Sequence, residues 1–269
     1  AAELLDVKEA TIDPPAGTDL VFNSIHGTFG EDGQLQAQLD QLGIPYTGAG
    51  AESSRLAFDK VASKERFLEA GVPTPESTIL PSTTFRAPDD QFFPCVVKPP
   101  KEGSSVGVHI VKEGAEWKAA MEDVAKYSGT ALVERFIQGK ELTVGIFDGE
   151  AFPVVHIQPR SGFYDMKNKY PWMSNEGGTD YVCPAELSEE VTRVVQDAAL
   201  QAHRSLHIEV YSRVDVLLND EDEKPFVLEV NTIPGMTASS LLPKGAAATG
   251  LAFPMLCLRI AEASLALRG

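Results

Sequence analysis

Two apolar segments, YSRVDVLLN (211–219) and PFVLEVN (225–231), are separated only by the polar turn DEDEK, which predicts an antiparallel pair of strands. A symmetric register about Asp222 sets Asp215 opposite Glu229, and Arg213 opposite Asn231. Side chains two residues apart lie on the same face of a strand. The four polar groups would therefore project together, just before the hydroxyl-rich segment NTIPGMTASSLLP.

The composition of this cluster suits a metal and phosphate site. The oxygens of Asp215, Glu229 and Asn231 are hard ligands that suit Mg²⁺, especially beside phosphate oxygens. Arg213 can hold a phosphate or a developing oxyanion. The alternative is a salt-bridged strand surface that faces solvent, which is the better interpretation of a lone Arg-x-Asp. The coincidence of four such groups favours a site.

Strands and helices alternate along the rest of the chain, and antiparallel pairs follow. With 269 residues, this predicts an α/β or α+β protein of more than one domain. We expect strands at 18–25, 94–100, 107–111 and 130–137, a hairpin at 141–157 that turns on Asp148-Gly149, and helices at 31–43, 56–73, 115–128, 188–206 and 252–268. Residues 159–186 carry little periodicity, which is typical of a functional loop or of disorder.

Composition excludes some classes of partner. The net charge is −16, from 23 basic and 39 acidic residues, which argues against nucleic acid but leaves a small anion such as ATP possible in a local basic pocket. No apolar run approaches the roughly 20 residues of a membrane span. Cys95, Cys183 and Cys257 are odd in number and far apart, which favours reduced thiols in a cytoplasm.

Further candidate residues have two interpretations each. Lys98 ends an apolar strand before PPKEGSSVG, and such a glycine- and serine-rich loop can wrap phosphates or form an ordinary turn; it is no Walker A sequence. Lys60 is a phosphate ligand or a solvated charge. Glu134 and Glu141 are either residues of the functional site or ordinary surface carboxylates. His26 precedes a helix start, where anions bind, or is structural.

Taken together, these motifs resemble the D-alanine–D-alanine ligase family of the ATP-grasp fold. The resemblance runs in the family's order from about residue 18 to the end. It is carried by HGTFGEDGQLQAQLDQLGIPYTGAG, AFDK, VVKPPKEGSSVG, ERFIQGKELTVG, KYPWMSNEGGTDYVCPAEL, SRVDVLLN and LEVNTIPGMTASSLLP.

The resemblance implies a partial, Rossmann-like N-terminal α/β substrate domain (1–58), a central ATP-grasp domain (59–139) and a C-terminal ATP-grasp domain with the metal and acceptor site (140–269). It implies a cytoplasmic ligase, usually a homodimer, with no nucleic-acid or membrane partner. The enzyme would use ATP and two Mg²⁺ (or Mn²⁺) to join two D-alanines through an acyl phosphate, releasing ADP and phosphate. The product, D-alanyl-D-alanine, serves peptidoglycan synthesis.

The resemblance also assigns residues to this reaction, and the mobile active-site loop to 159–186. Binding of ATP would involve Lys60 and Lys98 at the phosphates under the lid EGSSVG, Glu134 at the adenine, Glu141 at the ribose and Lys169 near the transferred phosphate. Asp215, Glu229 and Asn231 would hold the metals. The catalytic set would comprise Arg213 and the Gly235 backbone at the tetrahedral intermediate, Ser240 at the carboxylate of the second D-alanine, and Tyr170 with Ser104 beside the first.

One departure separates this sequence from the family. The family begins with a glycine-rich strand and a helix start whose Glu completes the triad with Tyr170 and Ser104, and residues 1–17 do not match that segment. We therefore expect the chain as given to bind Mg-ATP, make little dipeptide and self-associate through the strand at 18–25. The alternatives are a catalytically incomplete ATP-binding module and a ligase with a D-lactate or D-serine acceptor. The stretch KNKY, with Tyr170, favours dipeptide formation.

Overall fold

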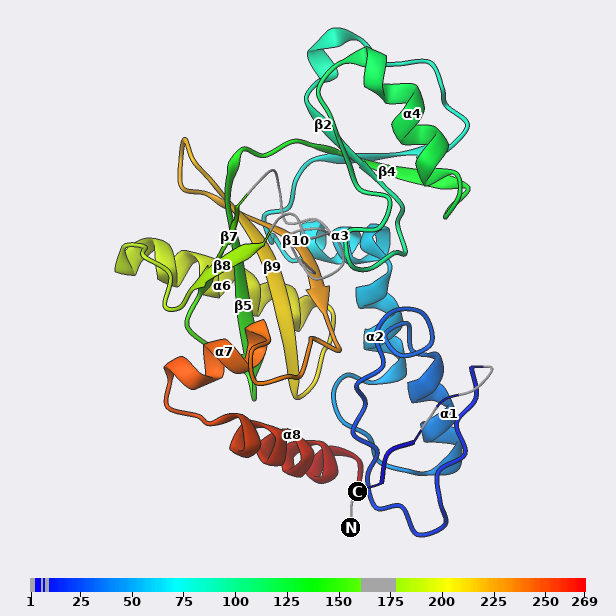
Figure 1. Ribbon diagram of the computed structural model, residues 1–269, viewed down its shortest axis with the longest axis vertical. Helices are drawn as coiled ribbons and strands as arrows, with labels where there is room; N and C mark the ends of the chain where they lie inside the picture. Colours follow the sequence, from blue (N-terminus) through cyan, green and yellow to red (C-terminus); the bar gives the residue numbers. More distant parts are fainter. Residues whose placement is uncertain (1–2, 6, 8–9, 161–177) are drawn as a thin grey trace.

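The computed structural model describes residues 3–5, 7, 10–160 and 178–269 (Figure 1). Its N-terminal part packs Val21, Phe29, Tyr46 and α1 (Gln34–Leu42) into a small core. Helix α1 confirms the helix expected at 31–43, and Gly43 is its C-cap residue. Leu35 and Leu39 are buried, whereas Leu42 is exposed.

The strand expected at 18–25 is wrong. Within the described residues this segment forms only one isolated bridge, in which Val21 pairs with Tyr46 in parallel. Two backbone hydrogen bonds make the bridge, from Val21 N to Pro45 O (2.8 Å) and from Thr47 N to Val21 O (3.0 Å). A continuous strand needs paired backbone along its length, and residues 45–47 supply it at one point only.

The single helix expected at 56–73 is also wrong, because the structure has two helices, α2 (Ala51–Phe58) and α3 (Lys60–Glu69). Asp59 separates them with extended backbone (ψ 102°), and its carboxylate accepts hydrogen bonds from the N–H groups of Val61 and Ala62. Asp59 is thus the N-cap of α3. The break gives α3, which carries Lys60, a direction independent of α2.

A four-stranded antiparallel sheet follows, in the order β1-β4-β2-β3, with helix α4 against it (Figure 1). Its core surrounds Trp117, which is 1% exposed. The strands expected at 94–100, 107–111 and 130–137 and the helix at 115–128 are confirmed, whereas β1 and the short helix η1 were not predicted. The elements are β1 (Ser77–Pro81), η1 (Asp90–Phe92), β2 (Cys95–Lys98), β3 (His109–Val111), α4 (Gly114–Val124) and β4 (Thr130–Arg135).

The second sheet has the order β10-β9-β5-β7-β8, and β6 pairs with β5. Asp148 and Gly149 turn the predicted hairpin with φ of 51° and 76°. Strand β8 lies inside 159–186, where we expected no element. The strands are β5 (Gly139–Phe147), β6 (Glu150–Ala151), β7 (Val155–Pro159), β8 (Thr179–Val182), β9 (Tyr211–Asn219) and β10 (Pro225–Asn231).

Different helices pack against the two faces of this sheet. Val214, Val216 and Leu218 of β9 pack in the main core with α6 (Glu189–Ser205). The N-cap of α6 is Ser188, whose side chain accepts from Val191 N. Toward the opposite face lies α7 (Leu241–Ala248), which was not predicted, followed by α8 (Phe253–Arg268). Gly145 of β5 permits the approach of α7, because a Cβ there would lie 2.6 Å from Leu242 Cδ1.

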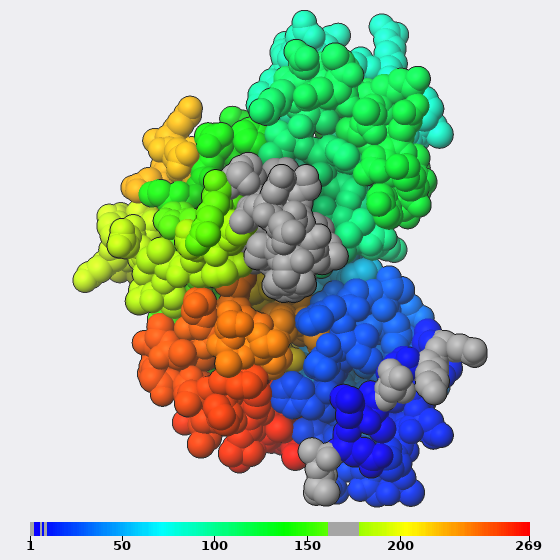
Figure 2. Space-filling model, in the orientation of Figure 1, coloured from blue at the N-terminus to red at the C-terminus, as the bar shows by residue number. Residues whose placement is uncertain are grey.

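The N-terminal part and the end of the chain are in contact, as Figure 2 shows in blue and red. The guanidinium of Arg268 lies 4.5 Å from the centre of the Tyr46 ring, and Gly50 N donates to Glu209 Oε2 (3.0 Å). Ser53 Oγ donates to the carbonyl of His207 (2.6 Å). These contacts fix residues 46–53 beside the second sheet.

Two further expectations concern the whole chain. Cys95, Cys183 and Cys257 are all free thiols. In the described part of the chain no single helix has the length and apolar character to cross a membrane; α7 and α8 meet that test only as a pair, by length and composition, with a 103° bend between them.

Candidate active site

The predicted hairpin pairs are present, but the register is not symmetric along the whole hairpin. Glu229 lies opposite Asp215 and Asn231 opposite Arg213, whereas Val227 pairs with Val216 because the register shifts by one residue between Val227 and Glu229. The bulge places Leu228 and Glu229 in succession on the half-buried face, and Val230 returns to the core. Without it, alternation from Val227 would turn Glu229 into the core.

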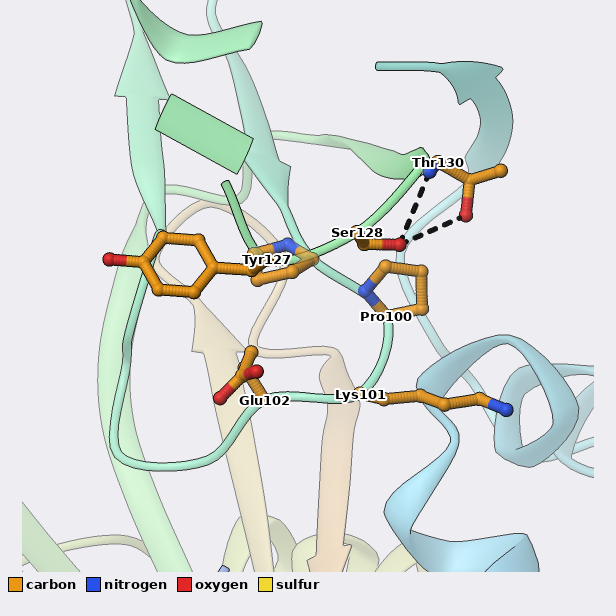
Figure 3. Close-up of a pocket in the computed structure, with 7 residues that line it drawn as sticks. Pro100, Lys101, Glu102, Tyr127, Ser128 and Thr130 are labelled. Atoms are coloured by element: carbon orange, nitrogen blue, oxygen red, sulfur yellow. Dashed lines mark hydrogen bonds between the residues drawn. The ribbon is translucent and has the colours of Figure 1, made fainter. Parts of the chain in front are cut away.

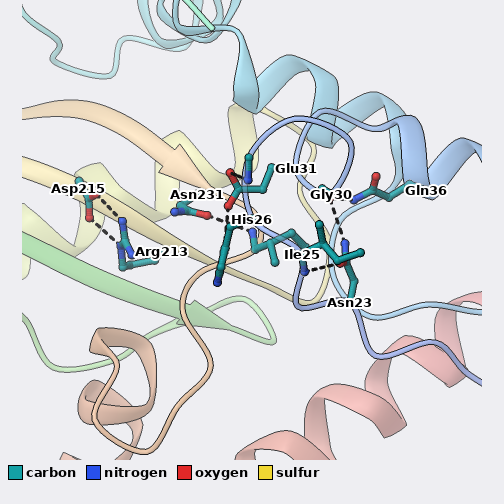
Figure 4. A network of polar contacts seen from close by, with 11 residues as sticks. Asn23, Ile25, His26, Gly30, Glu31, Gln36, Arg213, Asp215 and Asn231 are labelled. Carbon is teal, nitrogen blue, oxygen red and sulfur yellow. Dashed lines mark hydrogen bonds and ion pairs between the residues drawn. The ribbon is translucent and has the colours of Figure 1, made fainter. Parts of the chain in front are cut away.

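Asp215 is held by two neighbours on this face. Arg213 donates to both its oxygens, from Nε (2.9 Å) and from an Nη (2.7 Å), as Figure 4 shows. Thr143 Oγ1 of β5 donates a third hydrogen bond, to Asp215 Oδ1 (2.7 Å). The carboxylate is therefore oriented by charge-assisted bonds, and Thr143 is a participant that the sequence patterns did not reveal.

Glu229 faces the lysine that begins α3. Lys60 Nζ lies 3.0 Å from Glu229 Oε2 and donates to the carbonyl of Glu102 in the glycine- and serine-rich loop (2.6 Å). Lys60, which sequence alone left as a phosphate ligand or a solvated charge, thus connects the second sheet to that loop.

The donor set suits a hard cation. Asn231 Oδ1 accepts from Ile233 N (3.1 Å), which orients the amide and leaves an oxygen lone pair. In the described ranges no group of three or more His, Cys, Asp or Glu side chains could hold a metal ion. The set here is instead two carboxylates and an amide oxygen, a composition that fits Mg²⁺ bound together with phosphate oxygens.

A second cluster joins α3 to the four-stranded sheet. The two oxygens of Glu134 (β4) lie 2.7 Å from Lys64 Nζ and 2.6 Å from Lys98 Nζ. All three side chains are less than a tenth exposed. Burial alone would raise the pKa of Glu134, but Lys98 and Lys64 outweigh it and hold the pKa below its ordinary value. Burial lowers the pKa of Lys64, against the attraction of Glu134.

The loop between β2 and β3 has unusual backbone. Ser104 and Ser105 have φ of 53° and 60°, in the left-handed region that is unfavourable for residues other than glycine. Gly107 has φ 66°, and a Cβ there would lie 3.0 Å from Pro99 and 3.1 Å from Tyr127.

A cavity of about 310 Å³ lies at the base of the loop between β2 and β3 (Figure 3). The residues that line it are Pro99, Pro100, Lys101, Glu102, Tyr127, Ser128 and Thr130. Lys98 and Glu134 do not line it.

Asp215, Glu229 and Asn231 are called the metal-type cluster below. His26 and Glu31 approach it from the N-terminal part (Figure 4). Glu31 Oε2 accepts from Gly27 N (2.8 Å), and Glu31 Oε1 lies 3.4 Å from His26 Nδ1. Hydrogen bonding to Glu31 raises the pKa of His26, against burial and the positive charge of Arg213. A Cβ on Gly103 would lie 3.9 Å from Glu31 Oε2, so the loop after β2 also reaches this corner.

Ser240 closes a turn with Thr237 after β10, and Gly235 lies beside this turn. Ser240 Oγ accepts from Thr237 N (3.1 Å) and lies 2.8 Å from Thr237 Oγ1. A Cβ on Gly235 would lie 2.9 Å from Ser240 Oγ. Ser240 also precedes α7 as its N-cap residue.

The structure brings most of the predicted site residues into these clusters, and their individual roles remain predictions. Glu141 is half-buried on β5, opposite Leu217 and Ile157. Tyr170 and Lys169 lie outside the described residues. Sequence reasoning missed Lys64 and Glu31; the only signal for Lys64 was its spacing of four residues from Lys60.

Two antiparallel sheets and helix α3 bring lysines, a glycine- and serine-rich loop and a hard-donor cluster together, and this arrangement defines an ATP-grasp enzyme. Models of the D-Ala-D-Ala ligase C-terminus and N-terminus match residues 73–262 and 4–49. The chain belongs to the D-alanine–D-alanine ligase family, which confirms the resemblance and, at the level of the family, the expected ATP-dependent ligation for cell-wall synthesis.

Similar proteins and solved structures agree with membership of this family. A D-alanine–D-alanine ligase of Methylacidiphilum infernorum is 45% identical, over 97% of this chain and 83% of the relative. A crystal structure of D-alanine–D-alanine ligase from Bacillus anthracis complexed with ATP is 35% identical, with a TM-score of 0.79 over 93% of this chain and 80% of that one. The VanG D-Ala:D-Ser ligase from Enterococcus faecalis is 29% identical, with a TM-score of 0.79 over 91% and 73%.

Proposed function

We propose that this chain binds ATP, two Mg²⁺ or Mn²⁺ ions and two D-alanine molecules, and joins the amino acids through an acyl phosphate. The observation that carries the proposal is the meeting of Asp215, Glu229 and Asn231 on one sheet face beside Lys60. Hard oxygen donors and an ammonium group on one face can receive a metal-bound polyphosphate.

The nucleotide lies between the two sheets in this proposal. Lys60 and Lys98 bind phosphate oxygens, and the loop with Ser104 closes over them. Glu134 accepts from the adenine amino group, and Glu141 binds the ribose. The ion pairs of Lys60 with Glu229 and of Lys98 with Glu134 support this, because they hold both ammonium groups in place before phosphate arrives. Lys169 contacts the transferred phosphate.

Asp215, Glu229 and Asn231 would hold the divalent cations. The bound metal neutralises phosphate charge and so assists transfer to a carboxylate. The bidentate contact of Arg213 with Asp215 keeps the guanidinium on the same face, where it meets the charge that develops at the reacting carbon.

The chemistry has two steps. A carboxylate oxygen of the first D-alanine attacks the terminal phosphorus of ATP and ADP leaves; Tyr170 and Ser104 position this substrate. The neutral amine of the second D-alanine then attacks the acyl carbon. Arg213 and the Gly235 backbone N–H stabilise the oxyanion, phosphate leaves, and the new amide nitrogen loses a proton. Ser240 holds the carboxylate of the second D-alanine. A closed site keeps water from the acyl phosphate.

Further parts of the proposal concern organisation. The domain limits 1–58, 59–139 and 140–269 are supported by the helix break at Asp59 and by the separate cores of the two sheets. We place the enzyme in the cytoplasm as a homodimer, since its substrates are cytoplasmic metabolites and its family is commonly dimeric.

Phosphate release tests the function. Mg-ATP alone should give little phosphate, D-alanine should stimulate release, and D-alanyl-D-alanine should accumulate in equal amount. ATP binding without D-alanine-dependent release would identify an ATP-binding module instead, which is the outcome expected if no Glu completes the triad with Tyr170 and Ser104. If D-serine or D-lactate, added together with D-alanine, stimulates phosphate release more than D-alanine alone, the chain uses the alternative acceptor. The structural similarity to a D-Ala:D-Ser ligase is the reason to test these acceptors.

A further inference from the structure

Lys64 is a buried charge that the proposed reaction does not use. Its side chain is 4% exposed, on the same face of α3 as Lys60 one turn earlier. Its ammonium group lies 2.7 Å from Glu134 Oε1 and donates to Thr74 Oγ1 at 2.7 Å. Thr74 in turn donates to the carbonyl of Val227 (2.8 Å), at the bulge that directs Glu229.

The charges of this cluster are unequal. Two lysines, Lys64 and Lys98, share the single carboxylate of Glu134, one on each oxygen. If Lys98 alone were paired with Glu134, the pair would be neutral where the nucleotide phosphates are to bind. Lys64 neutralises the carboxylate from its other side, so the cluster retains one net positive charge. In a poorly solvated site a charge of this kind acts strongly on an anion.

We propose that Lys64 is a positioning residue for nucleotide binding: it neutralises Glu134 so that the charge of Lys98 remains available to the phosphates of ATP. The inference rests on the proposed nucleotide site. Through Thr74, the ammonium group of Lys64 is also anchored to the strand that carries Glu229. Helix α3 therefore connects the cluster of Lys64, Lys98 and Glu134 to the metal-type cluster.

Three variants separate charge balance from packing. Lys64→Met removes the charge and keeps most of the side-chain volume. Lys64→Met with Glu134→Gln removes both charges, restores one net positive charge on Lys98, and keeps a carbonyl oxygen for the adenine amino group. Thr74→Val removes only the hydroxyl anchor. Thermal unfolding of each variant checks that it folds.

The readouts are equilibrium binding of ATP and ADP by calorimetry and, for the reaction, KM for ATP against KM for D-alanine. Lys64→Met should weaken ATP binding at least tenfold and raise KM for ATP with little effect on KM for D-alanine. The double variant should bind ATP at least fivefold more tightly than Lys64→Met, because removal of the unneutralised carboxylate makes the charge of Lys98 available again. Thr74→Val should lose thermal stability and bind ATP within about threefold.

Two results would overturn the role. One is unaltered ATP affinity in Lys64→Met; the other is a folded double variant that binds ATP no more tightly than Lys64→Met. If Lys64→Met does not fold, Lys64→Gln takes its place in the same comparison. Failure of the proposed function is distinct, because the unaltered chain would then bind no ATP or would release no phosphate with D-alanine.

Discussion

Asp215 lies directly opposite Glu229 across β9 and β10, one residue beyond a bulge that shifts the register of the pair. Nearer the turn, Leu218 pairs with Pro225, a register that would not bring the two carboxylates together if it continued. The bulge is therefore the feature that places the carboxylates of Asp215 and Glu229 opposite each other on one face of the hairpin.

Replacing one of these acids tests the metal assignment. Glu229→Gln should lower Mg²⁺-dependent turnover at least a hundredfold, because an amide oxygen is a much weaker ligand than a carboxylate. The measurement is phosphate release against Mg²⁺ concentration, with thermal unfolding to confirm the fold. Glu221→Gln, on the exposed turn of the same hairpin, is the matched control. Normal turnover of Glu229→Gln at ordinary Mg²⁺ would remove this residue from the metal site.

Ser240→Ala tests the acceptor site. Loss of the hydroxyl should raise KM for the second D-alanine tenfold or more and change KM for ATP little, because a hydrogen bond to a carboxylate is lost. Steady-state kinetics in both substrates measure this, with Ser239→Ala, whose residue is exposed, as the control. A fall in thermal stability with unaltered KM for D-alanine would instead give Ser240 a structural role in its turn with Thr237.

Gly145→Ala tests the close approach of α7 to the second sheet. The added Cβ would meet Leu242 Cδ1 at 2.6 Å and Phe152 at 3.0 Å, so these packed side chains must move. We expect a loss of about 1–3 kcal/mol in the free energy of unfolding, as for other overpacked cores. Chemical denaturation measures it. Gly129→Ala, where a Cβ meets nothing within 4 Å, should cost less. Equal losses in the two variants would contradict the packing argument.

His203 gives the fold a dependence on pH. Burial lowers its pKa to about 4 from an ordinary 6.5. Its Nδ1 lies 2.8 Å from Ser212 Oγ. Between these values the unfolded chain binds the extra proton, so the free energy of unfolding should fall by up to about 1.4 kcal/mol per pH unit as pH drops from 6.5 toward 4. His203→Gln, which can still bond to Ser212, should unfold with a shallower pH dependence over that interval. Identical profiles for the two proteins would refute the assignment.

The sequence predicted elements well where periodicity and turn chemistry agreed. The hairpin at Asp148-Gly149 and the helix expected from residue 188 follow from local rules. The predicted pairing of Asp215 with Glu229 is present only because of the bulge, since the register nearer the turn is one residue away from the symmetric one. The sequence did not reveal the bulge, because an extra residue leaves no mark in an apolar strand. The break at Asp59 was missed because the apolar pattern continues across it, and only the capping geometry reveals it.

Contacts between distant segments limited prediction of the site. Lys64 looks like an ordinary exposed helix residue until β4 and Thr74 surround it, and those partners lie 70 and 10 residues away in sequence. The segment 18–25 has a strand-like composition, yet the described residues offer it one bridging neighbour. Both cases show tertiary surroundings deciding what local composition leaves open.

The setting of Trp117 has a spectroscopic consequence. Its indole N–H donates to Thr84 O (2.8 Å), and the rings of Phe92 and Phe93 meet it edge-on, so its fluorescence depends on the packing of the four-stranded sheet alone. The chain contains one other tryptophan, Trp172. In a Trp172→Phe background, emission would follow the melting of this one core while circular dichroism follows the whole chain. Coincident curves would mean that the core melts together with the rest, and separated curves would resolve it as its own cooperative unit.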